Sequence, residues 1–138
     1  MMKTFWNQYK RQVVFSSVMT LLPILAGLLL WDQLPAQMVT HWGADGTPDG
    51  TGSRAFAVLG IPLILLAVHW FCLLFTAKDP ASKKISRHAL GIVFWICPLI
   101  SISVNTMVYR IALGHTDNLM TPILLMMGAM FLILGNYF

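Results

Sequence analysis

The sequence predicts an all-α protein embedded in a membrane, and three observations support this fold class. Of its 138 residues, 57% are hydrophobic and only 10% are charged, whereas soluble domains carry about 25% charged residues. The mean hydropathy is +0.73. Four long apolar runs alternate with polar segments, and a helix satisfies its backbone polar groups within one such run. We therefore expect one transmembrane domain over residues 1–138.

The four apolar runs give the expected transmembrane helices. Residues 13–31 carry no charge and would rise about 28 Å as a helix, close to the ~30 Å hydrocarbon core. A signal peptide competes for this run, but its apolar region would have only ~7–15 residues. The second helix is expected at 55–77, with Ser53 as its N-cap. The third and fourth are expected at 89–109 and 119–138.

The lysines and arginines sort to one side of the expected helices. Seven of the nine lie near the N-terminus or after the second run: Lys3, Lys10, Arg11, Lys78, Lys83, Lys84 and Arg87. Because basic residues stay cytoplasmic, both termini are expected inside and the loop 32–54 outside. Trp31 and Tyr109 would then be aromatic anchors at the outer interface. The bilayer is the partner that this sorting implies, and it argues against direct binding of nucleic acid.

The loop 32–54 is the one long polar segment with turn chemistry. Asp45-Gly46 and Asp49-Gly50 are both turn signals. We expect a glycine with positive φ among Gly43, Gly46 and Gly50, because Asp-Gly pairs favour such turns.

The piece before these turns, residues 37–42, is expected to be a short extended segment. Its apolar side chains, among them Met38, Val39 and Trp42, need cover. The loop should therefore fold back as a compact cap over the bundle.

Three loop residues, His41, Asp45 and Asp49, raise the question of a metal. Their spacing does not match a calcium loop, and one histidine with two aspartates is too few for a zinc site. We therefore expect no metal, no cofactor and no catalytic residue. A metal-dependent membrane enzyme that uses these three residues stays an alternative.

Polar side chains also occur within the apolar runs, at His69 and Asn105. An ionisable residue at membrane depth is by default a candidate for function. Cys72 and Cys97 fall at a similar depth, so a His-Cys-Cys site is a further option. We expect His69 to hydrogen-bond a neighbouring helix as a structural residue. The alternative is a small transporter or channel-like module with His69 and Asn105 in its path.

The loop carries a motif that resembles the SdpI-like immunity family of bacterial membrane proteins. The matching residues are Leu34-Pro35, His41-Trp42-Gly43, Gly46-Thr47-Pro48-Asp49-Gly50 and Ser53-Arg54. The closing Gly135-Asn136-Tyr137 resembles the step at which that family continues into a second half. The resemblance therefore implies a shortened form of a longer protein.

The resemblance implies a function in toxin resistance and signal transduction at the bacterial cell membrane. The expected partners are a secreted cationic peptide toxin and, in the complete protein, a cytoplasmic repressor. The residues expected to engage the ligand are His41, Trp42, Asp45, Asp49 and Arg54.

Overall fold

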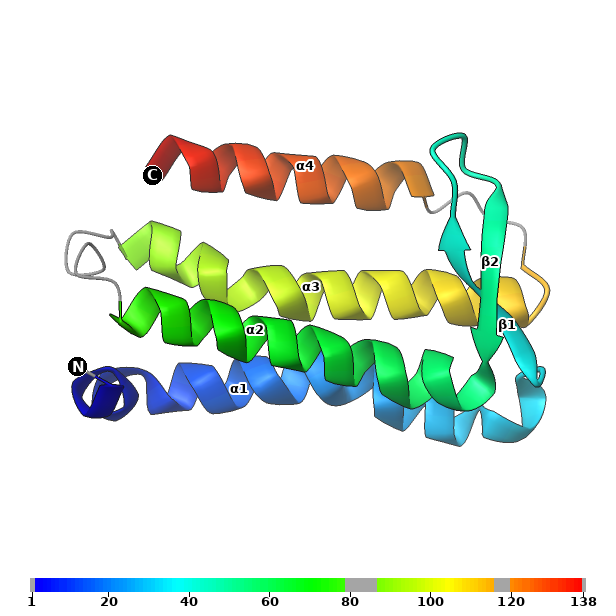
Figure 1. The fold of residues 1–138 in the computed structure, drawn as a ribbon, viewed down its shortest axis with the longest axis horizontal. Coiled ribbons are helices and arrows are strands. Elements are labelled where there is room, and N and C mark those ends of the chain that lie inside the picture. Colours follow the sequence, from blue (N-terminus) through cyan, green and yellow to red (C-terminus); the bar gives the residue numbers. More distant parts are fainter. Residues whose placement is uncertain (1, 79–86, 116–119, 138) are drawn as a thin grey trace.

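Three long helices lie side by side, and a β-hairpin lies across one end of them (Figure 1). The computed structural model describes residues 2–78, 87–115 and 120–137. In chain order the elements are α1 (Met2–Leu29), a 3-10 turn (Trp31–Gln33), β1 (Gln37–Trp42), β2 (Pro48–Ser53), a π-helical turn (Phe56–Gly60), α2 (Ile61–Lys78), α3 (Arg87–Ala112) and α4 (Met120–Tyr137).

The helices confirm the all-α class, and three of them are long and apolar enough to cross a membrane. These segments are Lys3–Leu29, Phe56–Lys78 and Leu90–Ala112. The apolar part of α4, Met120–Asn136, is shorter than the ~20 residues that a spanning helix needs. These helices agree with a multi-pass membrane protein. A fourth span stays a prediction.

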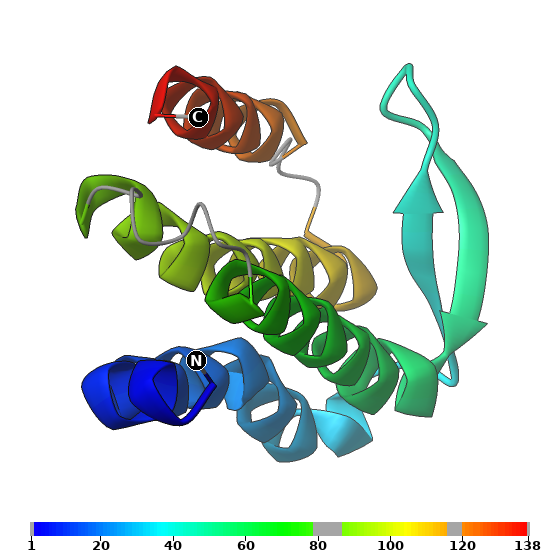
Figure 2. The ribbon, with the colours of Figure 1, turned by 60° about the vertical axis from the view of Figure 1, so that its left-hand side comes forward.

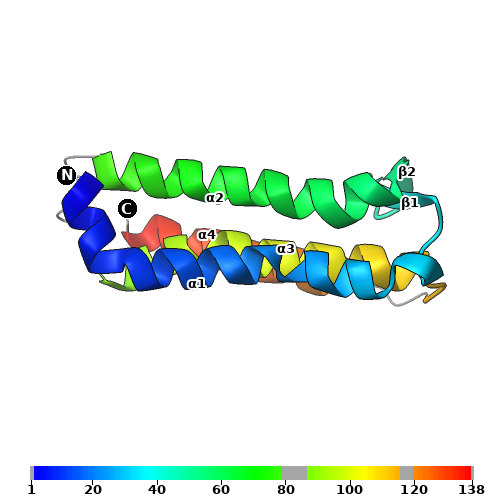
Figure 3. The same ribbon diagram turned by 90° about the horizontal axis from the view of Figure 1, so that it is seen from below.

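The first helix starts well before the expected residue 13. Residues 3–12 contain no proline or glycine that would break a helix, so the polar N-terminal segment continues into the apolar one without a break. The first turns are angled away from the rest of α1 (Figure 3). The expected boundary marked the change in polarity, not the start of the helix.

The Ser53 side chain caps the start of the second span, as the sequence predicts. Its Oγ accepts a hydrogen bond from the amide of Phe56 at 3.1 Å. The first full turn is then π-helical, and the Ile61 amide bonds the carbonyl of Phe56. Pro62 has no amide hydrogen to offer the next carbonyl, that of Ala57. The second span therefore begins with one carbonyl that its own backbone leaves without a donor.

The helices α1, α2 and α3 pack against one another, and α4 packs chiefly against α3 (Figures 1 and 2). The buried polar side chains of these three helices are Ser16, Thr20, His69, Ser101 and Asn105. The start of α1 and the end of α4 lie at the end of the bundle opposite the hairpin (Figure 1). The side of the membrane on which each terminus lies stays a prediction.

Candidate functional site

The outer loop is a two-stranded antiparallel hairpin. The Gly43 amide donates to the Thr47 carbonyl at 2.8 Å, and the Gly46 amide donates to the Gly43 carbonyl at 3.0 Å. Gly46 has φ +83°, a conformation that a glycine adopts without steric cost. The expected glycine with positive φ is therefore confirmed, and Asp45-Gly46 forms the tip of the hairpin.

The second turn signal, Asp49-Gly50, was wrong as a turn. Both residues lie in β2, where Gly50 pairs with His41. The hairpin closes instead at Asp45-Gly46. Thr40 and Asp49 have no partner residue in the strand register and lie at two irregularities between the strands. Such bulges re-aim side chains.

The bulged strands place two polar side chains next to each other on the exposed face. The Nδ1 atom of His41 lies 2.5 Å from the Oδ1 atom of Asp49. The His41 side chain is 74% exposed and the Asp49 side chain 49% exposed. The aspartate can hold the imidazole in one orientation through this contact, since carboxylate partners fix the tautomer of a histidine. The Nε2 atom of His41 faces away from this bond and stays available to a ligand.

Asp45 is held by the chain at the hairpin tip. Its Oδ1 accepts hydrogen bonds from the Thr47 hydroxyl at 2.7 Å and from the Thr47 amide at 3.1 Å. These bonds, the one from the hydroxyl first, hold the pKa of Asp45 below its usual value. The tip therefore presents a fixed negative charge to solvent.

The base of the hairpin is attached to the helices by apolar packing. Met38 is 1% exposed and belongs to a buried cluster that also contains Leu34, Ala57, Val58, Val108 and Tyr109. Trp42 is half-buried and packs against the same cluster. The expected cap is therefore confirmed, and its contact is with the end of α3 and the start of the second span.

Arg54 closes the base of the hairpin. Its Nη1 donates to the Trp31 carbonyl at 2.8 Å, and its guanidinium lies 5.0 Å from the centre of the Trp31 ring. The Arg54 amide also donates to the Ala36 carbonyl at 3.0 Å. This one residue connects the end of β2 to the 3-10 turn and the loop that follow α1.

The five expected ligand residues therefore divide into two groups. His41, Asp45 and Asp49 are exposed on the hairpin. Trp42 and Arg54 make contacts that hold the hairpin in place. Their assignment as ligand residues stays a prediction, and a substitution at either would also disturb the hairpin.

A second candidate site is a seam of buried polar groups where α1, α2 and α3 meet. The Nε2 of His69 lies 2.8 Å from the Ser16 hydroxyl, so His69 does bond a neighbouring helix as expected. The Thr20 hydroxyl donates to the Ser16 carbonyl at 2.8 Å, and the Ser101 hydroxyl donates to the Thr20 carbonyl at 2.7 Å. These bonds link all three helices.

The seam continues toward the hairpin through Asn105 and Tyr109. The Asn105 amide donates to the Ala57 carbonyl at 3.1 Å, the carbonyl that Pro62 leaves without a donor. The Tyr109 hydroxyl donates to the Pro23 carbonyl at 2.7 Å. The expectation that Tyr109 is an interfacial anchor was wrong, because its side chain is buried and bonds α1.

Sequence reasoning missed Gly27 on this seam. A Cβ atom there would meet the Tyr109 hydroxyl and a Val58 methyl group, each at 2.5 Å. The missing side chain therefore admits both neighbours. The small-residue step Ala26-Gly27 in an apolar run was the signal for such a close approach.

Two buried atoms on the seam have no partner among the described residues, Nδ1 of His69 and Oδ1 of Asn105. Unpaired buried polar atoms are uncommon. They mark the places at which a water molecule or a passing polar group would find a bond.

A cluster of three or more histidine, cysteine, aspartate or glutamate side chains able to hold a metal ion does not occur in residues 2–78, 87–115 and 120–137. His41, Asp45 and Asp49 do not form such a cluster, and neither do His69, Cys72 and Cys97. The further option of a His-Cys-Cys site therefore finds no support in the part of the chain that the structure describes.

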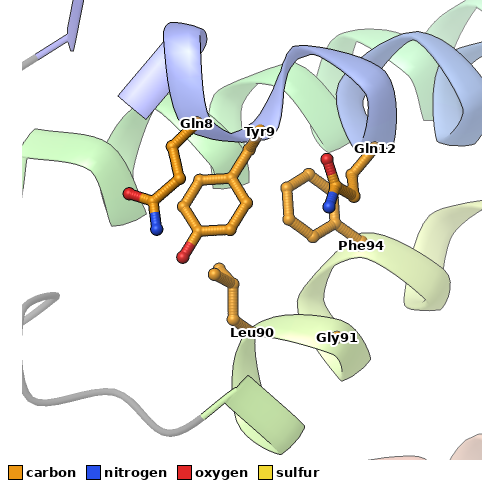
Figure 4. A pocket seen from close by; sticks show the side chains of 6 residues that line it. All are labelled: Gln8, Tyr9, Gln12, Leu90, Gly91 and Phe94. Atoms are coloured by element: carbon orange, nitrogen blue, oxygen red, sulfur yellow. The ribbon is translucent and has the colours of Figure 1, made fainter. Parts of the chain in front are cut away.

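A hollow of about 370 Å³ lies between α1 and α3 at the end opposite the hairpin. Figure 4 shows the amides of Gln8 and Gln12 on either side of the rings of Tyr9 and Phe94. These two rings have their centres 5.9 Å apart. Among the described residues, the walls carry amide and hydroxyl groups and no charged side chain.

The fold and the seam thus define a small helical protein that has three helices long and apolar enough to cross a membrane and a hairpin at one end. Residues 18–66 match the family model described as "Domain of unknown function (DUF1648)". No curated protein and no solved structure matches the chain. The matched segment contains the C-terminal part of α1, the whole hairpin and the start of α2, so it includes the first candidate site.

Proposed function

We propose that the protein is an integral membrane protein of the toxin-immunity and signal-transduction kind, whose hairpin engages a secreted cationic peptide. One observation carries this proposal. The hairpin is fixed to the bundle at its base, and it exposes His41, Asp45 and Asp49 along its free part. A fixed hairpin loses little conformational freedom when it binds, which favours recognition. The resemblance of residues 34–54 to the SdpI-like family supports the same function.

Charge determines the class of ligand in this proposal. Asp45 and Asp49 are the acidic residues on the free part of the hairpin. The nearest arginine or lysine in sequence, Arg54, lies at the base against Trp31. A cationic peptide that reaches the membrane surface would meet this field first. Charges at the rim of an interface act mainly on the association rate, and salt screens them over about 10 Å.

Expression of the complete gene in a sensitive bacterium tests the proposal. We expect protection against a cationic, membrane-active peptide. The variant Asp45→Asn should weaken protection, more so at low salt, while the neutral side chain still accepts the Thr47 bonds. Asp32→Asn is the matched control, because Asp32 is exposed at the same end but lies outside the strands. Equal sensitivity with and without the gene, across a broad panel of peptides, would remove immunity.

Trp42→Ala tests a separate part of the proposal. Truncation of an aromatic anchor costs about 2 kcal/mol or more of binding, so protection should be lost while membrane levels stay unchanged. Because Trp42 also packs on the base of the hairpin, the folded amount must be measured in the same cells. Loss of protection that follows loss of protein would assign Trp42 to the fold alone.

The buried seam favours a second candidate, a small transporter or channel-like module. His69 and Asn105 each keep one buried atom without a partner, and intramembrane polar residues often mark a path. Replacement of His69 by leucine should leave the fold intact, with a loss of no more than about 2 kcal/mol. Complete loss of activity in that folded variant would favour transport over immunity.

A further inference from the structure

Two apolar grooves meet on α1 at the end of the bundle opposite the hairpin. The first has a volume of about 560 Å³ and runs between α1 and α2. Its walls include Val13, Val14 and Leu21 from α1 and Leu66, Leu73 and Leu74 from α2. This volume lies in the range of small-molecule sites in proteins.

The second groove lies beside the first and carries two basic side chains. Its volume is about 480 Å³, and it is lined by Lys10 and Arg11 together with Trp6, Val14, Phe15 and Val18. Trp6, Val14 and Val18 line both grooves. One ridge of three side chains thus separates the two grooves, and Lys10 and Arg11 line the second groove.

Two polar side chains on the wall of the first groove, Ser17 and Trp70, already have hydrogen-bond partners. The Trp70 indole donates to the Ser17 hydroxyl at 2.9 Å, and Ser17 donates to the Val13 carbonyl at 2.7 Å. These polar groups bond one another and the helix backbone. A polar ligand placed there would lose its hydrogen bonds to water without replacement, so the occupant must be a hydrocarbon.

The depth of the first groove fits one leaflet of a membrane. From residue 13 to residue 21 a helix rises about 12 Å, close to half of the ~30 Å hydrocarbon core. Lys10 and Arg11 come just before this stretch and are exposed, and Trp6 is exposed at a level where headgroups are expected. The carboxylates of the described residues, Asp32, Asp45 and Asp49, lie at the hairpin end.

We infer that this surface binds one anionic phospholipid. Its phosphate lies at Lys10 and Arg11, and its two acyl chains lie in the two grooves, on either side of Val14 and Val18. Basic residues beside a span attract anionic lipids of the cytoplasmic leaflet, and the apolar walls take the chains. A zwitterionic lipid would fill the grooves without the charge pairing. The inference is independent of the immunity proposal, because it concerns the opposite end of the bundle.

Native mass spectrometry of the purified protein, with added phosphatidylglycerol or phosphatidylcholine, tests the headgroup. We expect one tightly bound phosphatidylglycerol and weaker phosphatidylcholine. Each basic side chain removed, by Lys10→Gln or Arg11→Gln, should weaken phosphatidylglycerol binding about fivefold. Lys78→Gln is the matched control, since Lys78 is exposed at the same end but lines neither groove, and it should leave binding unchanged.

A second pair of variants tests the grooves. Val14→Trp places a large ring on the ridge between the two grooves, where it takes up space in them. This variant should lower phosphatidylglycerol binding at least fivefold. Leu25→Trp adds the same ring on an exposed part of α1 that lines neither groove, and it should have no effect. Three results would overturn the inference: equal binding of the two lipids, equal loss with Lys10→Gln and Lys78→Gln, or a dimer that replaces the lipid adduct.

Discussion

At the scale of single residues, the Asn105 side chain in α3 supplies a hydrogen bond that the backbone at the start of the second span lacks. Pro62 leaves the Ala57 carbonyl without a backbone donor, and the Asn105 amide takes that place from α3. An unpaired buried carbonyl costs about 1–3 kcal/mol. This bond therefore holds α3 against the π-helical turn that precedes α2.

Replacement of Asn105 by leucine should remove this bond at nearly constant size. We expect the free energy of unfolding in detergent to fall by about 1–2 kcal/mol, since intramembrane hydrogen bonds are modest on average. Thr106→Val is the control, because the Thr106 hydroxyl is exposed and bonds only its own helix, at the Ile102 carbonyl. Equal effects of the two substitutions would mean that Asn105 adds nothing beyond ordinary helix packing.

The hydroxyl of Thr47 should determine the acidity of Asp45. Its bond is the main reason that the pKa of Asp45 lies below the ordinary 3.8. Thr47→Val should therefore raise this pKa toward the ordinary value, as measured by titration of the carboxyl carbon in NMR spectra. Thr51→Val, elsewhere in the hairpin, should leave it unchanged.

The same bond determines how the stability of the hairpin tip depends on pH. The pKa of Asp45 is lower in the folded protein than in the unfolded chain. The ionised carboxylate therefore stabilises the hairpin tip at pH values above the pKa of the unfolded chain. That contribution is lost as the pH falls through the folded pKa. A Thr47→Val protein should be less sensitive to this acid range than the wild type, and greater sensitivity would contradict the assignment.

At the scale of elements, the hairpin depends on its turn and on its anchors. An isolated two-stranded hairpin is only marginally stable in water. Here Met38 in the buried cluster and Arg54 at Trp31 attach it to the helices. The turn is then set by Gly46, which has positive φ.

Replacement of Gly46 by valine should strain this turn by about 1–2 kcal/mol. We expect a lower melting temperature and a lower folded yield in detergent. Gly46→Asn is the matched control, because asparagine tolerates this backbone region far better than a β-branched residue. The space around Gly46 is open, so a clash cannot cause the difference. An unchanged melting temperature for the valine variant would contradict the strain.

At the scale of the whole molecule, the basic residues predict the orientation of the protein in the membrane. In a background without Cys72 and Cys97, a cysteine at Thr47 should react with an impermeant reagent in intact cells. A cysteine at Gln8, at the opposite end of the bundle, should react only after lysis. The reverse pattern would overturn the orientation. Ser82, in the basic connector, is a natural second inside position but lies outside the described residues.

The sequence by itself determined the features that depend on neighbours along the chain. Apolar runs require helices, because a membrane offers backbone groups no water. Ser53 before the second run and Asp45-Gly46 in the loop gave a cap and a turn, since these bonds close within four residues. His69 at membrane depth was predicted to bond a neighbouring helix, because polar groups in a span need a partner.

Tertiary structure alone decided which distant residues meet. The strand register made Asp49 a partner of His41 and not a turn residue. The close approach at Gly27 brought the Tyr109 hydroxyl to Pro23 and took Tyr109 away from the interface. The same packing placed Arg54 on Trp31. These contacts join residues that are far apart in sequence, or residues whose pairing depends on a bulge between the strands. The local sequence pattern does not predict them, because helix packing and strand pairing determine which distant residues meet.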